Sequence, residues 1–222
     1  MIDAVIEAYR LKDQVRTGWR MRGVGDPESV ADHSWGTAYL VLLFADEAGI
    51  DRAAALEVAT VHDLAEAITG DVATRVREMN DAELASAKRA REEAAVHELT
   101  RAYTAPAADR VRARWREYEE RATPEARFVR DMNLIDMCVQ AYRYESDGRY
   151  DPDAPNRHFP DYVGLDEFFA TTRPRLTTRL GRELFIGLVE RYAALPRVAE
   201  RGGARLTPGG PATGGDAPSR GR

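Results

Sequence analysis

Three polar side chains, His62, Asp63 and Glu66, stand out in a segment of nearly all small or apolar residues that reads ALEVATVHDLAEAI. On a continuous helix His62 and Glu66 project from one face, and Asp63 lies about 100° round from His62. An imidazole and two carboxylates at this spacing can offer two metal ligands and one acid/base group to a common point. The segment is therefore a candidate metal and catalytic site.

His33 begins another apolar stretch, which continues from Trp35 to Phe44. A histidine that faces the protein interior needs a polar partner, because a buried polar group without a hydrogen bond is costly. A metal ion shared with His62 and Asp63 would supply that partner. By itself an HD dipeptide indicates only a histidine beside a carboxylate, because such dipeptides arise by chance in many chains.

The other residues with reactive side chains have simpler interpretations. His97 lies in the charged run EEAAVHELTRAY and should be solvated, and His158 lies in a loop rich in Pro and Asn without a suitable neighbour. Cys138, the single cysteine, is part of an apolar helical pattern. It is expected to fill the core rather than to act as a nucleophile.

Helices must position these side chains. Apolar residues recur at helical spacing in nearly every segment, and strand-like alternation is almost absent, so the sequence predicts an all-α fold. Asp51 is a predicted N-cap, Asp81 another, and Gly49 follows a predicted helix end. The predicted helices cover residues 2–14, 29–49, 51–68, 81–103, 107–121, 124–145 and 175–195.

The helix that begins at Pro124 should be buried in the core, because its apolar side chains share one face. These side chains are Phe128, Met132, Ile135, Val139 and Tyr142.

The composition changes abruptly at Pro196. The last 27 residues contain 7 Gly and 4 Pro and no aromatic side chain. Such a segment cannot bury enough apolar surface to offset its ordering entropy. The sequence therefore predicts one domain over residues 1–195 and a disordered Gly/Pro-rich tail over residues 196–222.

Composition restricts the class of partner. The chain has 222 residues and a net charge of −5, and its arginines are interspersed with Asp and Glu. No basic stripe of the kind that follows a nucleic-acid backbone is visible, so a polymer substrate is disfavoured. No stretch reaches the roughly 20 apolar residues that span a bilayer, and the single cysteine fits a reducing compartment. A cytoplasmic protein that acts on a small molecule is expected.

Three strings together resemble the HD-domain phosphohydrolases of the 5′-deoxynucleotidase type. They are RTGW at residues 16–19, ESVADHSW at residues 28–35 and HDLAEAITGD at residues 62–71. The resemblance covers roughly residues 5–145, and the set of three is specific although a lone HD is not. It implies an all-helical HD-domain bundle that holds one divalent transition metal ion, such as Co²⁺ or Mn²⁺.

The resemblance also implies roles for individual residues. His33, His62 and Asp63 match the family's metal ligands. Glu66 matches its catalytic glutamate, and Asp71 a site aspartate, so either could activate water or protonate the departing oxygen. A further pair, Arg16 and Trp19, matches a loop that helps to hold the nucleotide and its phosphate.

The last metal ligand is where this sequence departs from the family. The family segment reads like FVKxLDxxxM, and alignment of Phe128 to Met137 with it places Asn133 where an aspartate is expected. An amide oxygen can still coordinate, but it lacks the negative charge. We expect Asn133 to be a weak or indirect ligand, with Asp136 as a nearby supporting group on the same helical face, whereas Asp131 points away.

The favoured function is removal of the 5′-phosphate from (deoxy)nucleoside monophosphates by metal-activated water, in a homodimer as the resemblance implies. Hydrolysis of a signalling or specialised nucleotide intermediate would use the same ligands. A di-iron oxygenase would need further histidines, and His97 is the only one after the HD pair and before the last carboxylate. A catalytically weak nucleotide-binding protein is a further alternative, which Asn133 motivates.

Overall fold

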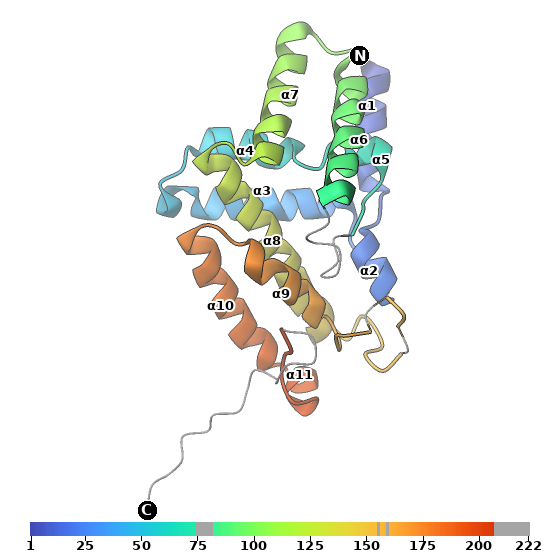
Figure 1. Cartoon of the computed structure of the whole chain (residues 1–222), viewed down its shortest axis with the longest axis vertical. Coiled ribbons are helices and arrows are strands. Elements are labelled where there is room, and N and C mark those ends of the chain that lie inside the picture. The colour runs from blue at the N-terminus through green and yellow to red at the C-terminus, as the bar shows by residue number, and fades with distance from the viewer. Residues whose placement is uncertain (74–81, 155, 159, 207–222) are drawn as a thin grey trace, which may run out of the picture.

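The computed structural model describes residues 1–73, 82–154, 156–158 and 160–206, and the regular elements of these residues are all helical. The predicted all-α fold is therefore confirmed (Figure 1). The elements are α1 (Ile2–Ala8), η1 (Tyr9–Lys12), α2 (Thr17–Arg22), α3 (Val30–Ala48), α4 (Arg52–Val61), α5 (Glu66–Thr69), α6 (Ala82–Thr100), α7 (Ala105–Glu120), α8 (Pro124–Ser146), α9 (Asp166–Thr172), η3 (Arg173–Arg175), α10 (Arg179–Ala193) and α11 (Pro196–Glu200).

Helix α8 is the centre of the domain and packs against α3, α4, α7, α9 and α10 (Figure 1). Its predicted buried face is confirmed: Phe128, Met132 and Ile135 are almost completely buried, and Val139 and Tyr142 are half-buried against the same core. Because α3 and α4 both lie on α8, side chains from three separate parts of the chain meet at one place.

Local side chains determine where α3 and α4 begin. The Ser29 hydroxyl accepts from the Asp32 backbone N–H, and the Asp32 carboxylate accepts from the Ser29 N–H, which is a complete capping box. Gly49 follows α3 in the left-handed conformation, and the Asp51 carboxylate caps α4. The predicted cap at Asp81 lies outside the described residues.

The predicted continuous helix over residues 51–68 is wrong. Helix α4 ends at Val61, and α5 begins only at Glu66. The intervening turn has bonds to the third residue back, among them the Glu66 N–H to the Asp63 carbonyl at 3.0 Å. These tighter bonds overwind the chain relative to an α-helix, so the HD pair lies in a turn and not on a regular helical face.

The predicted domain boundary at residue 195 is also wrong, because α11 and the residues after it pack on the body. Val198 and Ala204 are completely buried. Arg201 forms ion pairs with Glu145 and Asp166, whose side chains are fully buried. The folded body therefore extends to residue 206, and the rest of the predicted tail lies outside the described residues.

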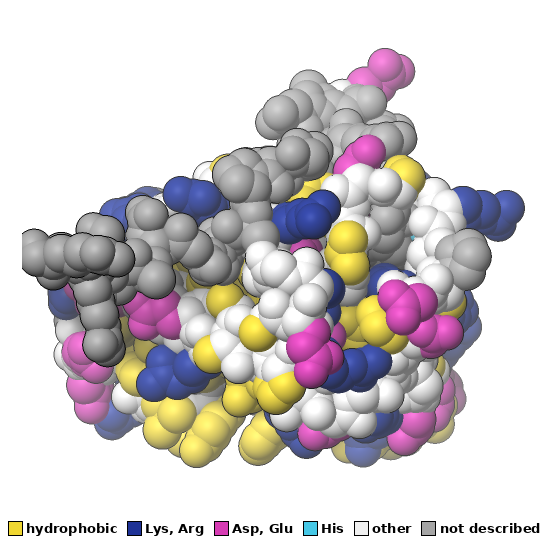
Figure 2. Space-filling model, turned by 90° about the horizontal axis from the view of Figure 1, so that it is seen from below, with side chains coloured by type: hydrophobic (Ala, Val, Ile, Leu, Met, Phe, Trp, Pro, Cys, Tyr) yellow, Lys and Arg dark blue, Asp and Glu magenta, His cyan; other side chains and the backbone are white. Residues whose placement is uncertain are grey.

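Positive and negative side chains are interspersed on the face shown in Figure 2, and hydrophobic side chains gather along one edge of that face. In the described part of the chain, no helix is both long enough and apolar enough to cross a membrane.

Candidate metal centre and active site

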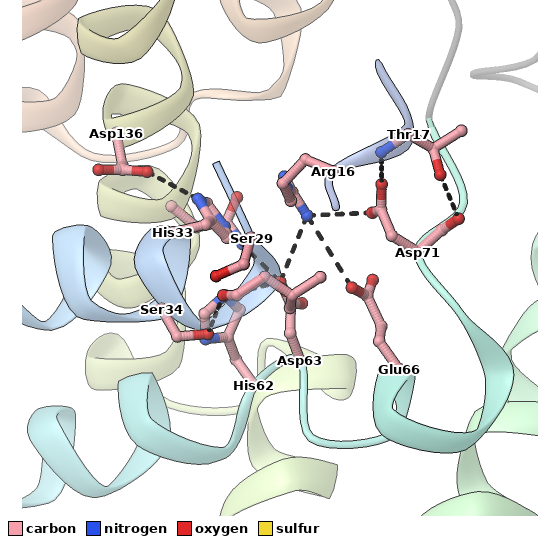
Figure 3. A network of polar contacts seen from close by, with 12 residues as sticks. Arg16, Thr17, Ser29, His33, Ser34, His62, Asp63, Glu66, Asp71 and Asp136 are labelled. Atoms are coloured by element: carbon pink, nitrogen blue, oxygen red, sulfur yellow. Dashed lines mark hydrogen bonds and ion pairs between the residues drawn. The ribbon is translucent and has the colours of Figure 1, made fainter. Parts of the chain in front are cut away.

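His33, His62 and Asp63 meet inside the protein. His33 projects from α3, His62 lies at the end of α4, and Asp63 follows in the turn (Figure 3). The Asp63 Oδ2 atom lies 3.3 Å from the His62 Nε2 atom and 3.6 Å from the His33 Nε2 atom. The three predicted ligands therefore offer two nitrogens and one oxygen to a common point.

Hydrogen bonds on the far side of each imidazole fix its orientation. The Nδ1 atom of His33 lies 2.6 Å from the Asp136 carboxylate, and the Nδ1 atom of His62 donates to the Ala59 carbonyl at 2.7 Å. With Nδ1 protonated in both rings, the Nε2 lone pairs face Asp63. Hydrogen bonds of this kind orient metal-binding histidines and make them more basic.

The atoms that face one another are unsatisfied. The Nε2 atoms of His33 and His62 and the Oδ2 atom of Asp63 are buried and have no hydrogen-bond partner. Buried polar atoms normally have one, because an unmade bond costs about 1–3 kcal/mol. A divalent metal ion would satisfy all three atoms together, so the donor set fits the ion that the family resemblance implies.

The protonation states also suit metal binding. Burial, assisted by the positive charge of Arg16, lowers the pKa of His33 to about 3, so its imidazole is neutral at ordinary pH. Burial alone would raise the pKa of Asp63, but His62, His33 and Arg16 outweigh it and hold the pKa well below its usual value. Neutral imidazole and ionised carboxylate are the ligand forms that a metal requires.

A second cluster of possible ligands shares His33 but is already satisfied. It comprises Glu28, His33 and Asp136. Asp136 accepts the His33 proton, and Glu28 accepts from the Trp19 indole N–H at 2.8 Å. An ion there would have to displace both bonds, so the cluster with Asp63 is the better metal site.

Arg16 stands beside the cluster and joins three carboxylates. Its guanidinium lies 3.1 Å from Asp71, 3.5 Å from Asp63 and 4.0 Å from Glu66 (Figure 3). The Asp71 carboxylate also accepts from the Thr17 backbone N–H, and the Thr17 hydroxyl donates to the Asp71 carbonyl at 2.9 Å. Asp71 therefore fastens the loop that carries Arg16.

Glu66 has the environment of a proton-transfer group. Its side chain is almost fully buried, and its Oε2 atom has no hydrogen-bond partner. Burial and the carboxylates of Asp63 and Asp71 raise its pKa well above the ordinary value. A glutamate whose pKa is raised in this way is suited to act as an acid or a base.

One pocket, which contains about 700 Å³ of space including its open mouth, is lined by Arg16, Asp63, Glu66 and Asp71. Trp19 lines the pocket but is only 2 % exposed, because its ring stacks on Phe168 at 4.0 Å and meets the edge of Tyr144. Trp19 is therefore part of the wall of the pocket and offers a ligand little free surface.

Asn133 lines the same pocket, and its side-chain amide donates to the Tyr118 hydroxyl at 2.8 Å. Tyr118 also meets the edge of the His62 ring, with the ring centroids 5.2 Å apart. The expected role of Asn133 as a weak metal ligand stays a prediction. Asp136, by contrast, lies behind His33, as expected of a supporting group.

The residues of the pocket wall that sequence reasoning missed include three cations, Lys88, Arg130 and Arg175, and the aromatic Phe168. Arg130 could have been found, because it precedes Asn133 by three residues on one helix and such residues are neighbours. Phe168 and Arg175 follow a loop far along the chain, and nothing local in the sequence connects them with the HD pair.

The HD-domain family model matches residues 8–161, a range that contains every residue of the metal cluster. This chain belongs to the HD-domain phosphohydrolase family. The family implies dependence on a divalent metal, which agrees with the unsatisfied atoms of His33, His62 and Asp63.

Individual relatives support this assignment. The chain is 32% identical over 164 residues to the 5′-deoxynucleotidase HDDC2 of Danio rerio, and the match covers 73% of each protein. It is 33% identical to the 5′-deoxynucleotidase HDDC2 of Homo sapiens, and that match covers 70% of this chain and 78% of the relative. It also resembles the crystal structure of a Pyrococcus horikoshii protein, with a TM-score of 0.63, 32% identity and coverage of 86% of this chain and 98% of that one.

Gly36 permits the contact that orients a ligand in this HD-domain site. A Cβ atom at residue 36 would lie 2.0 Å from the Asp136 carboxylate that holds His33. Gly36→Ala should displace Asp136 and weaken metal binding about 10- to 100-fold, the usual cost of losing such an outer contact. Metal titration by calorimetry measures this. Gly187→Ala is the control, because its Cβ would meet only the flexible end of Arg191; equal affinity in both variants would contradict the prediction.

Proposed function

We propose that this HD-domain protein removes the 5′-phosphate from deoxynucleoside monophosphates. The observation that carries the proposal is the cluster of three unsatisfied ligand atoms, one of which belongs to Asp63, a residue that lines a pocket together with Arg16 and Glu66. The names of the relatives, 5′-deoxynucleotidases, support the choice of substrate.

His33, His62 and Asp63 would hold one divalent transition metal ion, such as Co²⁺ or Mn²⁺, with the Asn133 amide oxygen as a weak further ligand. When bound, such an ion lowers the pKa of water and offsets the negative charge that develops on the phosphate.

The remaining groups of the pocket have distinct tasks in this proposal. Arg16 grips the phosphate through its planar guanidinium. Asp71 positions Arg16, because its carboxylate binds both that side chain and the Thr17 backbone. Glu66 moves the proton between the attacking water and the departing 5′ oxygen. Trp19 supports the wall on which the sugar and base lie.

Phosphate release from a panel of ribo- and deoxyribonucleoside monophosphates, with Co²⁺ or Mn²⁺ added, tests the proposal. We expect turnover of 5′-deoxynucleotides, loss of turnover with a chelator and recovery on addition of metal. No turnover with any metal and nucleotide would overturn the proposal. Turnover confined to a signalling nucleotide would favour the alternative substrate class.

The pKa of Glu66 leads to a prediction about stability. A raised pKa means that folding favours the neutral carboxyl, so the free energy of unfolding falls as the pH rises above the ordinary pKa of glutamate. Glu66→Gln removes this penalty. The metal-free variant should melt a few degrees above the wild type near pH 8, with a smaller difference near pH 5, while turnover falls about 10²- to 10⁴-fold. Glu98→Gln, on the exposed side of α6, is the control and should change neither the melting temperature nor the turnover. Equal melting temperatures of Glu66→Gln and the wild type near pH 8 would contradict the raised pKa of Glu66.

Asn133→Asp restores the carboxylate of the family pattern. We expect metal to bind about tenfold more tightly, because the added negative charge attracts the dication. Calorimetric titration with Mn²⁺ measures the change. Unchanged affinity would show that the residue at this position does not contact the ion.

The missing charge at Asn133 also favours one second function, a nucleotide-binding protein with little catalysis. Tight nucleotide binding without turnover at any metal concentration would support that function over the enzyme. The di-iron alternative is not supported, because His97 is exposed on α6 and does not line the pocket.

A homodimer and a cytoplasmic location are part of the same proposal. Four apolar side chains of α3 are between 47 % and 69 % exposed: Trp35, Tyr39, Leu42 and Leu43. Trp35 and Tyr39 stack on each other at 5.4 Å. Exposed apolar clusters often mark subunit interfaces. Sedimentation should therefore give twice the mass of the chain.

A further inference from the structure

Two arginines, Arg130 and Arg175, line the pocket beside Asn133. Arg130 comes from α8, and Arg175 from η3, the short helix that follows α9. Both side chains are half-buried. Within the described ranges, neither guanidinium has a carboxylate partner, and Asn133 adds no negative charge to this wall.

Two other arginines with little exposed surface are neutralised by carboxylates, and the buried Arg22 donates to the Gly164 and Pro152 carbonyls. Arg16 is within 4.0 Å of three carboxylates, and Arg201 pairs with Glu145 and Asp166. A charge removed from water is stable only when an opposite charge or several hydrogen bonds compensate it. Arg130 and Arg175 therefore differ from Arg16 and Arg201, because no carboxylate of the described residues pairs with either of them.

The donors of these two side chains are largely unused. Arg130 donates to the Tyr118 hydroxyl at 3.0 Å, but its Nε–H is buried without a partner. Arg175 makes no hydrogen bond to a described residue. Burial lowers the pKa of Arg175 to about 9, and repulsion by the neighbouring charge of Arg130 adds to this effect. An anion bound to both would remove this repulsion.

We propose that Arg130 and Arg175 form a second anion subsite, so that the preferred substrate carries a second phosphate group in addition to the one that is removed. This inference rests on the proposed function and extends its substrate class from monophosphates to nucleotides that carry a second phosphate. Guanidinium groups suit the role, because their forked donors match phosphate oxygens in pairs. The residues of the subsite lie on α8 and η3, whereas Arg16 lies at the start of α2. Different parts of the chain would therefore bind the two phosphate groups.

The second phosphate could be on the sugar or in a 5′ chain. The assay therefore compares a deoxynucleoside 5′-monophosphate, the corresponding 3′,5′-bisphosphate and the 5′-diphosphate. The measured quantity is the ratio of kcat/KM for each doubly phosphorylated nucleotide to that for the monophosphate. We expect a ratio of about ten or more for one of the two doubly phosphorylated nucleotides. The nucleotide with this ratio shows whether the second phosphate is attached to the sugar or to the 5′-phosphate.

Arg175→Gln should bring this ratio close to one. Arg173→Gln is the matched control, because Arg173 is exposed on the same short helix and does not line the pocket; it should keep the wild-type ratio. If Arg175→Gln folds poorly, Arg175→Lys takes its place in the test. The lysine keeps the charge but loses the forked guanidinium donors, so its ratio should be intermediate. A wild-type ratio near one, or an equal loss for all substrates in Arg175→Gln, would overturn the proposal.

Binding measured by calorimetry with a chelator present separates this inference from the proposed function. Tighter binding of the doubly phosphorylated nucleotide that disappears in Arg175→Gln supports the subsite even if no nucleotide is hydrolysed. Turnover of monophosphates without any preference for a second phosphate leaves the nucleotidase standing and rejects the subsite.

Discussion

Asp63→Asn should abolish phosphate release and metal retention together. Asp63 supplies the only carboxylate oxygen that faces both His33 Nε2 and His62 Nε2 among the residues described. The amide keeps the shape of the side chain but removes the charge that attracts a dication. We expect turnover to fall on the order of 10³-fold or more, since the ion supplies both the activated water and the stabilisation of charge. Metal content by elemental analysis and phosphate release measure the two effects.

The control for this variant is Asp46→Asn, which makes the same chemical change on the exposed side of α3. It should retain both metal and activity. Normal metal content in Asp63→Asn, with turnover within tenfold of the wild type, would contradict the assignment of the metal site to Asp63.

Arg201→Met should destabilise the whole domain. Arg201 bonds to Glu145 at 2.8 Å and to Asp166 at 3.1 Å, and both carboxylates are fully buried. Removal of the cation leaves two buried negative charges without compensation, which costs about 3–5 kcal/mol. A chain of this length loses roughly 2–4 °C of Tm for each kcal/mol, so we expect Tm to fall by about 10 °C. Thermal unfolding followed by circular dichroism measures it.

Arg191→Met is the matched control, because Arg191 is exposed on α10 and its guanidinium contacts only the Gly187 carbonyl. Its Tm should stay within a few degrees of the wild type. A similar small change in Arg201→Met would show that the residues after 195 contribute little to the domain, as the sequence alone suggested.

The sequence by itself determined the helical architecture and the candidate ligands. Helix ends depend on local groups such as the capping box of Ser29 and Asp32, so patterns over a few residues locate them. His33, His62 and Asp63 could be predicted as candidate ligands because they lie in largely apolar segments and match the ligand positions of the family that the sequence resembles. An interior position forces such groups to find one another or a metal ion.

Sequence periodicity could not place the turn at His62, because the same apolar spacing continues through it. The break depends on packing: α4 and α5 pack against different helices, α8 and α6. Tertiary contacts therefore override the helical preference of an Ala-rich segment, and local propensity is only a weak influence.

Only the tertiary structure decided which groups support the ligands and which charges are compensated. Asp136 reaches His33 because Gly36 lets α3 approach α8 closely, and Arg201 becomes structural because Glu145 and Asp166 are buried beside it. Arg175 resembles Arg201 in the sequence, yet it lies on the pocket wall without a carboxylate partner in the described chain. Pairing of a charge depends on residues distant in sequence, which is why composition alone could not tell a structural arginine from one available to a substrate.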